Sequence, residues 1–238
     1  MLELRSYLSA RERPPGFPVM HQRWERLLFL HWACEPAVLS PLLPAGLDLD
    51  LCEGRAWVAA TPFTLTGLPI PTAHRFHELN ARTYVHRDGV PGVWFFSLDA
   101  ASRLAVFGAR RLYKLPYYHA AMDVTEGDGA VHYTSRRTHA GAPPASFEAV
   151  YRPGAPLPES APGTLPFFLT ERYVLFAADA RGLHRARIHH APWPLHAASV
   201  AHLRSTLLEA AGLPTPAGEP LAHFSPSLQV EVWPLERA

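Results

Sequence analysis

Apolar residues recur along this chain in short runs, most of them of strand length. Residues 26–34 form one continuous apolar run, and residues 227–233 alternate strictly between apolar and polar side chains. Strict alternation is typical of a β-strand with one buried face. Glycine-containing turns at 87–89 and 127–129 separate neighbouring runs, so the sequence predicts β-hairpins.

The pattern predicts about ten strands and three or four helices. Strands are expected at residues 26–34, 47–52, 55–66, 76–86, 92–98, 117–125, 130–138, 146–151, 173–178, 183–190 and 227–233. A short helix should begin at Pro36, and one helical turn at 165–170. Two longer helices are expected at 100–113, with Asp99 as N-cap, and at 198–211.

Prolines at positions 14, 15 and 18 and a lack of periodicity predict an irregular arm over residues 1–22. The remainder, 23–238, shows no repeat and no low-complexity linker, so we expect a single domain. The strands come mostly as hairpins, which favours an antiparallel sheet over repeated βαβ units. So large a sheet must close or sandwich to remove its edges, and the expected fold class is mainly β (α+β).

Composition excludes several classes of protein. Of 238 residues, 48% are hydrophobic and 18% charged, unlike a disordered chain. The formal net charge of +1 offers no electrostatic footprint for nucleic acid or an anionic membrane. No apolar run reaches the ~18 residues of a membrane span, and we expect no signal peptide. With Cys34 and Cys52 in no motif, we expect a reduced, cytoplasmic setting.

The strand at 76–84 carries the most informative chemistry. Glu78, Asn80 and Arg82 share one face with Phe76 and Tyr84, while small and apolar side chains occupy the other face. A polar face is usually solvated in an antiparallel sheet. The alternative is a barrel lumen lined by a carboxylate, an amide and a guanidinium.

Two further features have ordinary explanations. Histidines gather at positions 184, 189 and 190. On a strand, 184 and 190 share one face and 189 lies on the other, so the three do not converge and no metal site is expected. Lys114, the one lysine in the sequence, could form a Schiff base if it were desolvated or near another cation. A solvated lysine at a helix end is the favoured interpretation.

Several motifs together resemble the YqjF-like family, bacterial proteins of unknown function within the acetoacetate-decarboxylase-like superfamily. They are Phe76-x-Glu78-Leu-Asn80-x-Arg82-Thr-Tyr84-Val, Gly92-Val-Trp-Phe-Phe-Ser-Leu-Asp-Ala100, Ala109-Arg110-Arg111-Leu-Tyr-x-Leu-Pro116-Tyr117, Phe168-Leu-Thr-Glu171-Arg172-Tyr173 and His190-x-Pro192-Trp193-Pro194-Leu. The resemblance implies a closed, cone-like β-barrel with a central pocket and outer helices. It also favours the lumen for Glu78, because the decarboxylases carry a pocket-facing Glu in the equivalent strand.

The decarboxylase chemistry does not carry over with the resemblance. Those enzymes follow their helix with Trp-Gly-Phe-Pro-Lys-Lys, whereas this chain has Tyr113-Lys114-Leu115-Pro116-Tyr117-Tyr118. Both lysines after the proline are tyrosines here, and a phenol cannot form an imine. We therefore expect no Schiff-base decarboxylation and no cofactor.

Two functions stay open: a module that binds a small carboxylate or carbonyl compound, and an enzyme that acts on a small organic acid. In the enzyme, Glu78 or His119 would be the general acid or base, and Arg82 or Arg136 would clamp a carboxylate. A buried Arg82 should pair with Glu78, Glu171 or Asp99. The candidate ligand-binding residues are Glu78, Asn80, Arg82, Tyr117, Tyr118, His119, Arg136 and Glu171. Whether the chain forms a homo-oligomer is left open.

Overall fold

The computed structural model describes residues 2–68 and 74–238. Its helices are α1 (Leu4–Arg11), α2 (Pro36–Leu39), the 3-10 turn η1 (Ser40–Leu42), α3 (Arg103–Leu112), α4 (Leu165–Thr170) and α5 (Leu207–Ala210). Its strands are β1 (Met20–Cys34), β2 (Asp48–Leu49), β3 (Ala56–Thr66), β4 (Arg75–Arg87), β5 (Val90–Ala100), β6 (Tyr117–Gly127), β7 (Ala130–Arg137), β8 (Ser146–Pro156), β9 (Val174–Asp179), β10 (Gly182–His189), β11 (His196–Ser205), β12 (Leu221–Val232) and β13 (Glu236–Arg237). The fold is mainly β, as the sequence pattern predicts.

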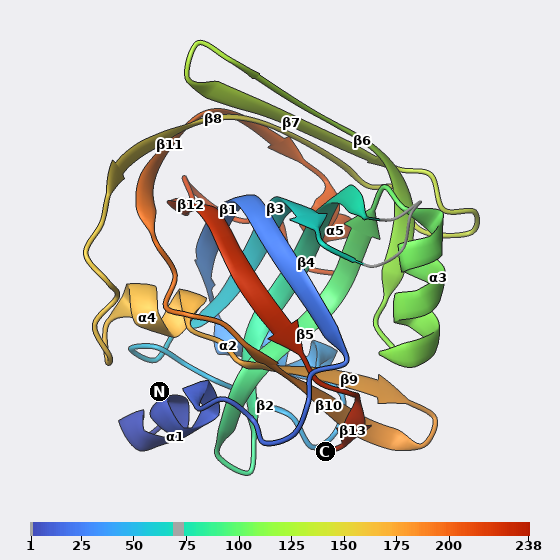
Figure 1. Ribbon diagram of the computed structural model, residues 1–238, viewed down its shortest axis with the longest axis vertical. Coiled ribbons are helices and arrows are strands. Elements are labelled where there is room, and N and C mark those ends of the chain that lie inside the picture. The colour runs from blue at the N-terminus through green and yellow to red at the C-terminus, as the bar shows by residue number, and fades with distance from the viewer. Residues whose placement is uncertain (1, 69–73) are drawn as a thin grey trace.

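Strand pairing forms two rings that share β12, β1, β3, β4 and β5. The larger ring runs from β5 through β6, β7, β8 and β11 to β12 and returns through the shared strands. Its four outer strands form the arch in Figure 1. The smaller ring connects β5 to β12 through β9 and β10. Most pairs are antiparallel, but β5 pairs in parallel with both β6 and β9, so the expectation of a purely antiparallel sheet was wrong.

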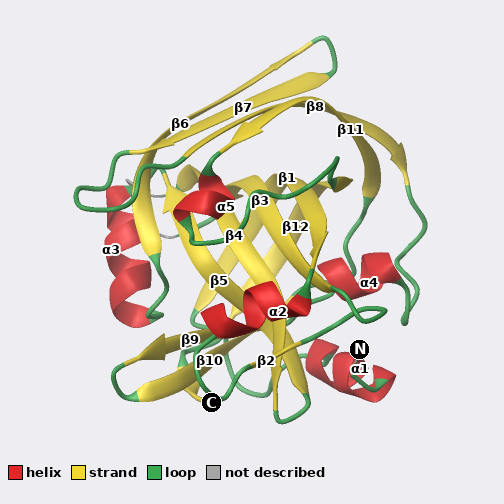
Figure 2. Ribbon diagram, turned by 180° about the vertical axis from the view of Figure 1, so that it is seen from behind, coloured by secondary structure: helices red, strands yellow, loops and turns green. Residues whose placement is uncertain are grey.

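The two faces of the shared strands look into different rings. Leu79 and Ala81 of β4 belong to a core cluster with Tyr133 and Phe147 of the larger ring. The small, apolar face of β4 is thus enclosed by the larger ring. Phe76, on the opposite face of β4, belongs to a second cluster that includes Val106 of α3. Helix α3 stands beside the sheet in both views (Figures 1 and 2).

The predicted helix at 198–211 is mostly strand β11, followed by the short helix α5. β11 pairs with β8 along almost its whole length, which satisfies the backbone groups on that edge. The register shifts between Val200 and His202, so the apolar residues on either side of the shift no longer follow a period of two. That irregularity gives Val200, Leu203 and Leu207 the spacing of a helix face.

The N-terminal part of α3 also departs from the sequence prediction. Asp99 is still within β5, and Ser102 is the N-cap, with its Oγ accepting a hydrogen bond from the backbone N–H of Ala105 at 3.2 Å. Residues 1–22 are not an irregular arm, since they contain α1 and the start of β1. The strands expected at 47–52 and 55–66 are joined only by an isolated bridge between Cys52 and Arg55, and the short strand β2 pairs with β4 instead. Among the described residues, no helix is long and apolar enough to span a membrane.

Candidate functional site

A cavity of about 230 Å³ lies on the side of the shared strands that faces the smaller ring and α3. Every strand of the smaller ring contributes to its wall. The polar lining residues are Gln22, Thr61, Glu78, Asn80, Arg82, Tyr113, Tyr117, Thr170 and Arg172, and apolar side chains make up the rest. The cavity therefore combines a small set of charged and hydrogen-bonding groups with a larger apolar wall.

Because side chains alternate between the two faces of β4, three of the predicted residues lie on the face that lines this cavity. Glu78, Asn80 and Arg82 are only 3%, 4% and 8% exposed, and all three line it. The register sets Phe63 of β3 opposite Glu78 and Thr61 opposite Asn80. The polar face of β4 is thus enclosed, and its side chains have almost no contact with bulk solvent.

Glu78 forms a hydrogen-bonded pair with Tyr117, the first residue of β6. The Tyr117 hydroxyl donates to Oε2 of Glu78 at 2.9 Å. Burial raises the pKa of Glu78 to about 8, although the hydrogen bond from Tyr117 lowers it. Burial, followed by the proximity of Glu78, also raises the pKa of Tyr117 well above 10. At neutral pH the pair is therefore mainly uncharged and can donate protons or hydrogen bonds.

Arg82 is buried without a carboxylate partner in residues 2–68 and 74–238. No ion pair joins it to Glu78, Glu171 or Asp99, so the expected partnership was wrong. Its Nε and Nη2 atoms have no hydrogen-bond partner there either. The guanidinium carbon lies 5.5 Å from the ring centre of Phe29 and 5.8 Å from that of Tyr84. Asn80 and Thr61 each leave a buried side-chain oxygen unpartnered as well.

A second arginine in the cavity wall, Arg172, forms an ion pair with a carboxylate. Its Nη1 lies 2.6 Å from Oδ2 of Asp50, and both side chains are almost completely buried. The hydroxyl of Tyr7 in α1 donates to the same carboxylate at 2.7–2.8 Å, and the Arg172 guanidinium carbon lies 4.3 Å from the ring centre of Phe168. The sequence analysis missed this cluster because Asp50 and Arg172 lie 122 positions apart.

The other four candidates lie outside the cavity. Tyr118 packs under Arg137, whose guanidinium carbon is 4.2 Å from the ring centre and whose Nε pairs with Asp99 at 2.8 Å. The Nδ1 atom of His119 is 2.8 Å from the Thr138 hydroxyl. Arg136 and Glu171 are also absent from the wall: Arg136 is exposed on β7, whereas Glu171 is buried and accepts hydrogen bonds from the Tyr173 hydroxyl and from the backbone N–H of Trp193.

Lys114 and the histidine cluster are also separate from the cavity. Lys114 is exposed just after α3, and its Nζ donates to the carbonyl of Arg111 at 3.0 Å. His184 lies 3.0 Å from Asp179, whereas His190 is buried against the ring of Tyr173, so the two do not converge. Burial lowers the pKa of His190 to about 4. No group of three metal-ligating side chains is present in the described residues.

Comparison with known proteins places this site in a family context. The family DUF2071, described as an uncharacterized conserved protein, matches residues 21–229. The uncharacterized protein YqjF of Bacillus subtilis (strain 168) is 40% identical over 230 residues, which cover 94% of each chain.

Solved structures with the same fold are more distant in sequence. The enduracididine biosynthesis enzyme MppR, complexed with pyruvate, has a TM-score of 0.63 at 12% identity over 94% of this chain and 92% of its own. An acetoacetate decarboxylase-like enzyme from Sphingomonas wittichii RW1 has a TM-score of 0.61 at 15% identity over 92% of each. The chain thus has the fold of acetoacetate decarboxylase-like proteins and belongs to the DUF2071 family of YqjF-like proteins.

Proposed function

We propose that this protein binds a small organic carboxylate in the cavity of the smaller ring, which acts as a closed barrel around the ligand. Arg82 holds the carboxylate of the ligand. The uncharged Glu78–Tyr117 pair donates hydrogen bonds to a carbonyl or hydroxyl oxygen of the same ligand. The protein does this without a Schiff base, because Lys114 lies outside the cavity. MppR, whose structure holds pyruvate, has a similar fold.

The observation that carries the proposal is the unpaired state of Arg82. A buried cation without a counter-ion is costly, and natural proteins normally pair it. Arg137 and Arg172, which are equally buried, each have a carboxylate within 2.8 Å. A bound anion would supply Arg82 with the partner that the described chain lacks, and a planar carboxylate fits the guanidinium fork.

The protonation state of Glu78 supports the same conclusion. An ionised Glu78 would repel an anionic ligand, whereas the pKa of about 8 keeps it mainly neutral at pH 7. The cavity at neutral pH thus holds two guanidinium groups, of which one is neutralised by Asp50. The net positive charge that remains belongs to Arg82.

A second function, acid–base catalysis on a small oxo acid, is favoured by the Glu78–Tyr117 pair. A group with a pKa near the working pH is best suited to proton transfer. Ionised Glu78 would take a proton from the carbon next to the carbonyl, and Arg82 would hold the carboxylate in place. His119 has no part in this chemistry because it lies outside the cavity.

Binding is tested by isothermal titration calorimetry with acetate and pyruvate, using their methyl esters as uncharged controls. We expect the acids to bind and the esters to bind at least tenfold more weakly. Arg82→Met should abolish binding of the acids, whereas Arg136→Met should not, since Arg136 is exposed outside the cavity. Equal binding by wild type and Arg82→Met would refute the proposal.

Catalysis is tested by proton NMR of pyruvate in D₂O. Exchange of the methyl protons for deuterium that requires wild-type protein and is lost in Glu78→Gln would establish proton transfer. Binding without exchange would leave the protein a binding module.

A further inference from the structure

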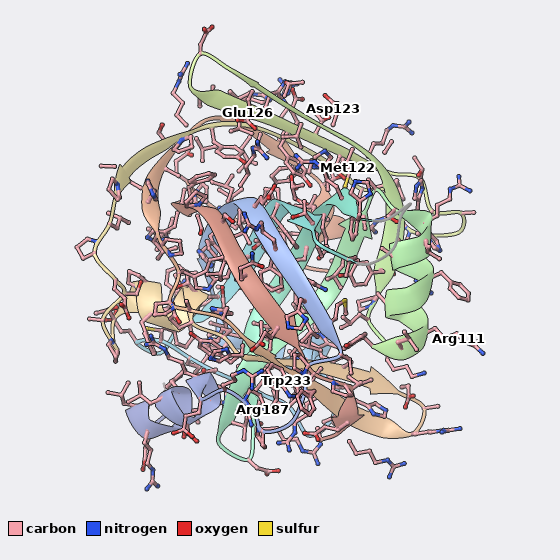
Figure 3. All side chains as sticks on the ribbon, viewed as in Figure 1. Arg111, Met122, Asp123, Glu126, Arg187 and Trp233 are labelled. Atoms are coloured by element: carbon pink, nitrogen blue, oxygen red, sulfur yellow. The ribbon has the colours of Figure 1, made fainter. Side chains whose placement is uncertain are left out.

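Helix α3 presents an apolar face to the cavity. Leu104, Ala105, Gly108, Ala109 and Leu112 line it, at the spacing of one face of a helix. Arg111 lies at the exposed end of the helix and points away from the body of the protein (Figure 3). The cavity-facing leucines are nevertheless incompletely covered, with Leu104 46% and Leu112 68% exposed.

Small residues at the centre of this face leave room beside the cavity. A Cβ atom added at Gly108 would meet no heavy atom within 4 Å. The neighbouring lining positions, Ala105 and Ala109, also carry minimal side chains. Glycine costs about 1 kcal/mol in a helix relative to alanine, so this space is kept at some expense of helix stability.

The sheet provides a matching apolar surface. Met20, Trp24, Leu65, Leu68 and Phe76 line the same cavity as α3. Within the sheet, Leu65 pairs with both Trp24 and Phe76, so these three residues lie at one level of neighbouring strands.

The level of Trp24, Leu65 and Phe76 lies at one end of the polar face of β4, and Arg82 lies at the other end. Arg82 lies six positions after Phe76, which corresponds to about 20 Å along a strand. Arg82 pairs with Ala59 and Phe95, far from the level of Trp24. A two- or three-carbon acid bound at Arg82 would leave the apolar end of the cavity empty.

We infer that the ligand is a free monocarboxylate with an extended apolar chain, held at Arg82 by its carboxylate and covered by α3 along its chain. The inference rests on the proposed function and specifies the class of ligand. It follows because one cavity contains both an unpaired guanidinium and an apolar wall that no part of the described chain covers. Short polar acids would satisfy Arg82 and leave the α3 wall hydrated.

The test is calorimetric titration with acetate, butanoate, hexanoate, octanoate and decanoate, all below their critical micelle concentrations. We expect affinity to rise by up to about fourfold for each added methylene until the cavity is filled. The variant Gly108→Leu should weaken octanoate binding at least tenfold and weaken acetate binding much less, because acetate reaches only the Arg82 end of the cavity. Leucine improves helix propensity at this site, so the variant should fold.

Gly127→Leu is the matched control. Gly127 also has no atom within 4 Å of an added Cβ and a φ outside the left-handed region, but it lies at the end of β6, away from the cavity. It should bind the whole series like wild type.

The outcomes separate the two proposals. If acetate binds through Arg82 but octanoate binds no tighter, the apolar-chain inference is wrong and the proposed function stands. If Gly108→Leu weakens acetate and octanoate equally, the inference is also wrong. If no acid in the series binds, the proposed function itself fails.

Discussion

Replacing Arg82 by methionine should stabilise the ligand-free protein while it removes ligand binding. The change deletes a buried cation whose Nε and Nη2 have no partner in the described chain. Methionine is two atoms shorter than arginine, but its flexible side chain adapts to irregular apolar space. The surroundings suit it, because the guanidinium lies over the rings of Phe29 and Tyr84.

The magnitude follows from two opposing contributions. The two unsatisfied buried nitrogens, Nε and Nη2, cost about 2–6 kcal/mol together. The two cation–π contacts return about 1–4 kcal/mol, at roughly 0.5–2 kcal/mol each. At the middle of both ranges, the net gain on removing Arg82 is about 1–2 kcal/mol. For a chain of this length, such a gain raises the melting temperature by roughly 2–8 °C.

Arg172→Met is the control, because it removes a similarly buried arginine that does have a carboxylate partner. Asp50 would be left with Tyr7 alone, and breaking a buried pair costs about 3–5 kcal/mol. Urea unfolding followed by circular dichroism would compare the free energies of unfolding of both variants with wild type. If Arg82→Met destabilises the protein as much as Arg172→Met, Arg82 is not an uncompensated charge and the argument for an anion site fails.

Three further predictions concern other groups. Because Glu78 has a folded pKa of about 8 against 4.5 when unfolded, its contribution to stability is intact below pH 4.5 and is lost as pH rises to 8. Between these pH values the free energy of unfolding of the wild type should thus fall by on the order of 5 kcal/mol, and this dependence should be lost in Glu78→Gln. A variant with the same pH profile as the wild type would refute this. Borohydride with acetoacetate should leave the protein mass unchanged in mass spectrometry, and an adduct on Lys114 would overturn the exclusion of imine chemistry. Tyr7→Phe should cost about 1–3 kcal/mol by removing the hydroxyl that donates to buried Asp50, which urea titration would detect; no loss would mean that this hydrogen bond does not stabilise the fold.

Local patterns were sufficient to predict most strands but not their partners. The hairpins β4–β5, β6–β7 and β9–β10 lie close to the expected ranges because their turns and alternation are local properties. The strand β11 was mistaken for a helix because its register shift at 200–202 disguises its period. The pairing of β2 with β4 depends on an edge of β4 that β3 leaves free, and no local signal reports that edge.

The site was predictable only where one strand determines it. Alternation along β4 brings Glu78, Asn80 and Arg82 to one face, and the structure places that face in the cavity. The alternation of side chains along a strand cannot reveal that the shared strands belong to two rings. It therefore could not indicate which residues of the outer strands face this cavity. Arg136, on β7 of the larger ring, therefore lies outside it.

The distribution of buried charge gives a last argument for function at this cavity. Asp99 pairs with Arg137 and Asp50 pairs with Arg172, so these buried charges are compensated within the chain. Arg82 breaks this rule, and three neighbouring polar groups in the wall depart from their ordinary state: Glu78 is held neutral, and Asn80 and Thr61 leave oxygens unpartnered. A fold selected for stability alone would replace them with apolar residues, as it does on the opposite face of β4 at Leu79 and Ala81. These four residues line one cavity, and the carboxylate ligand that we propose there would supply the negative charge that Arg82 lacks and partners for the neighbouring polar groups.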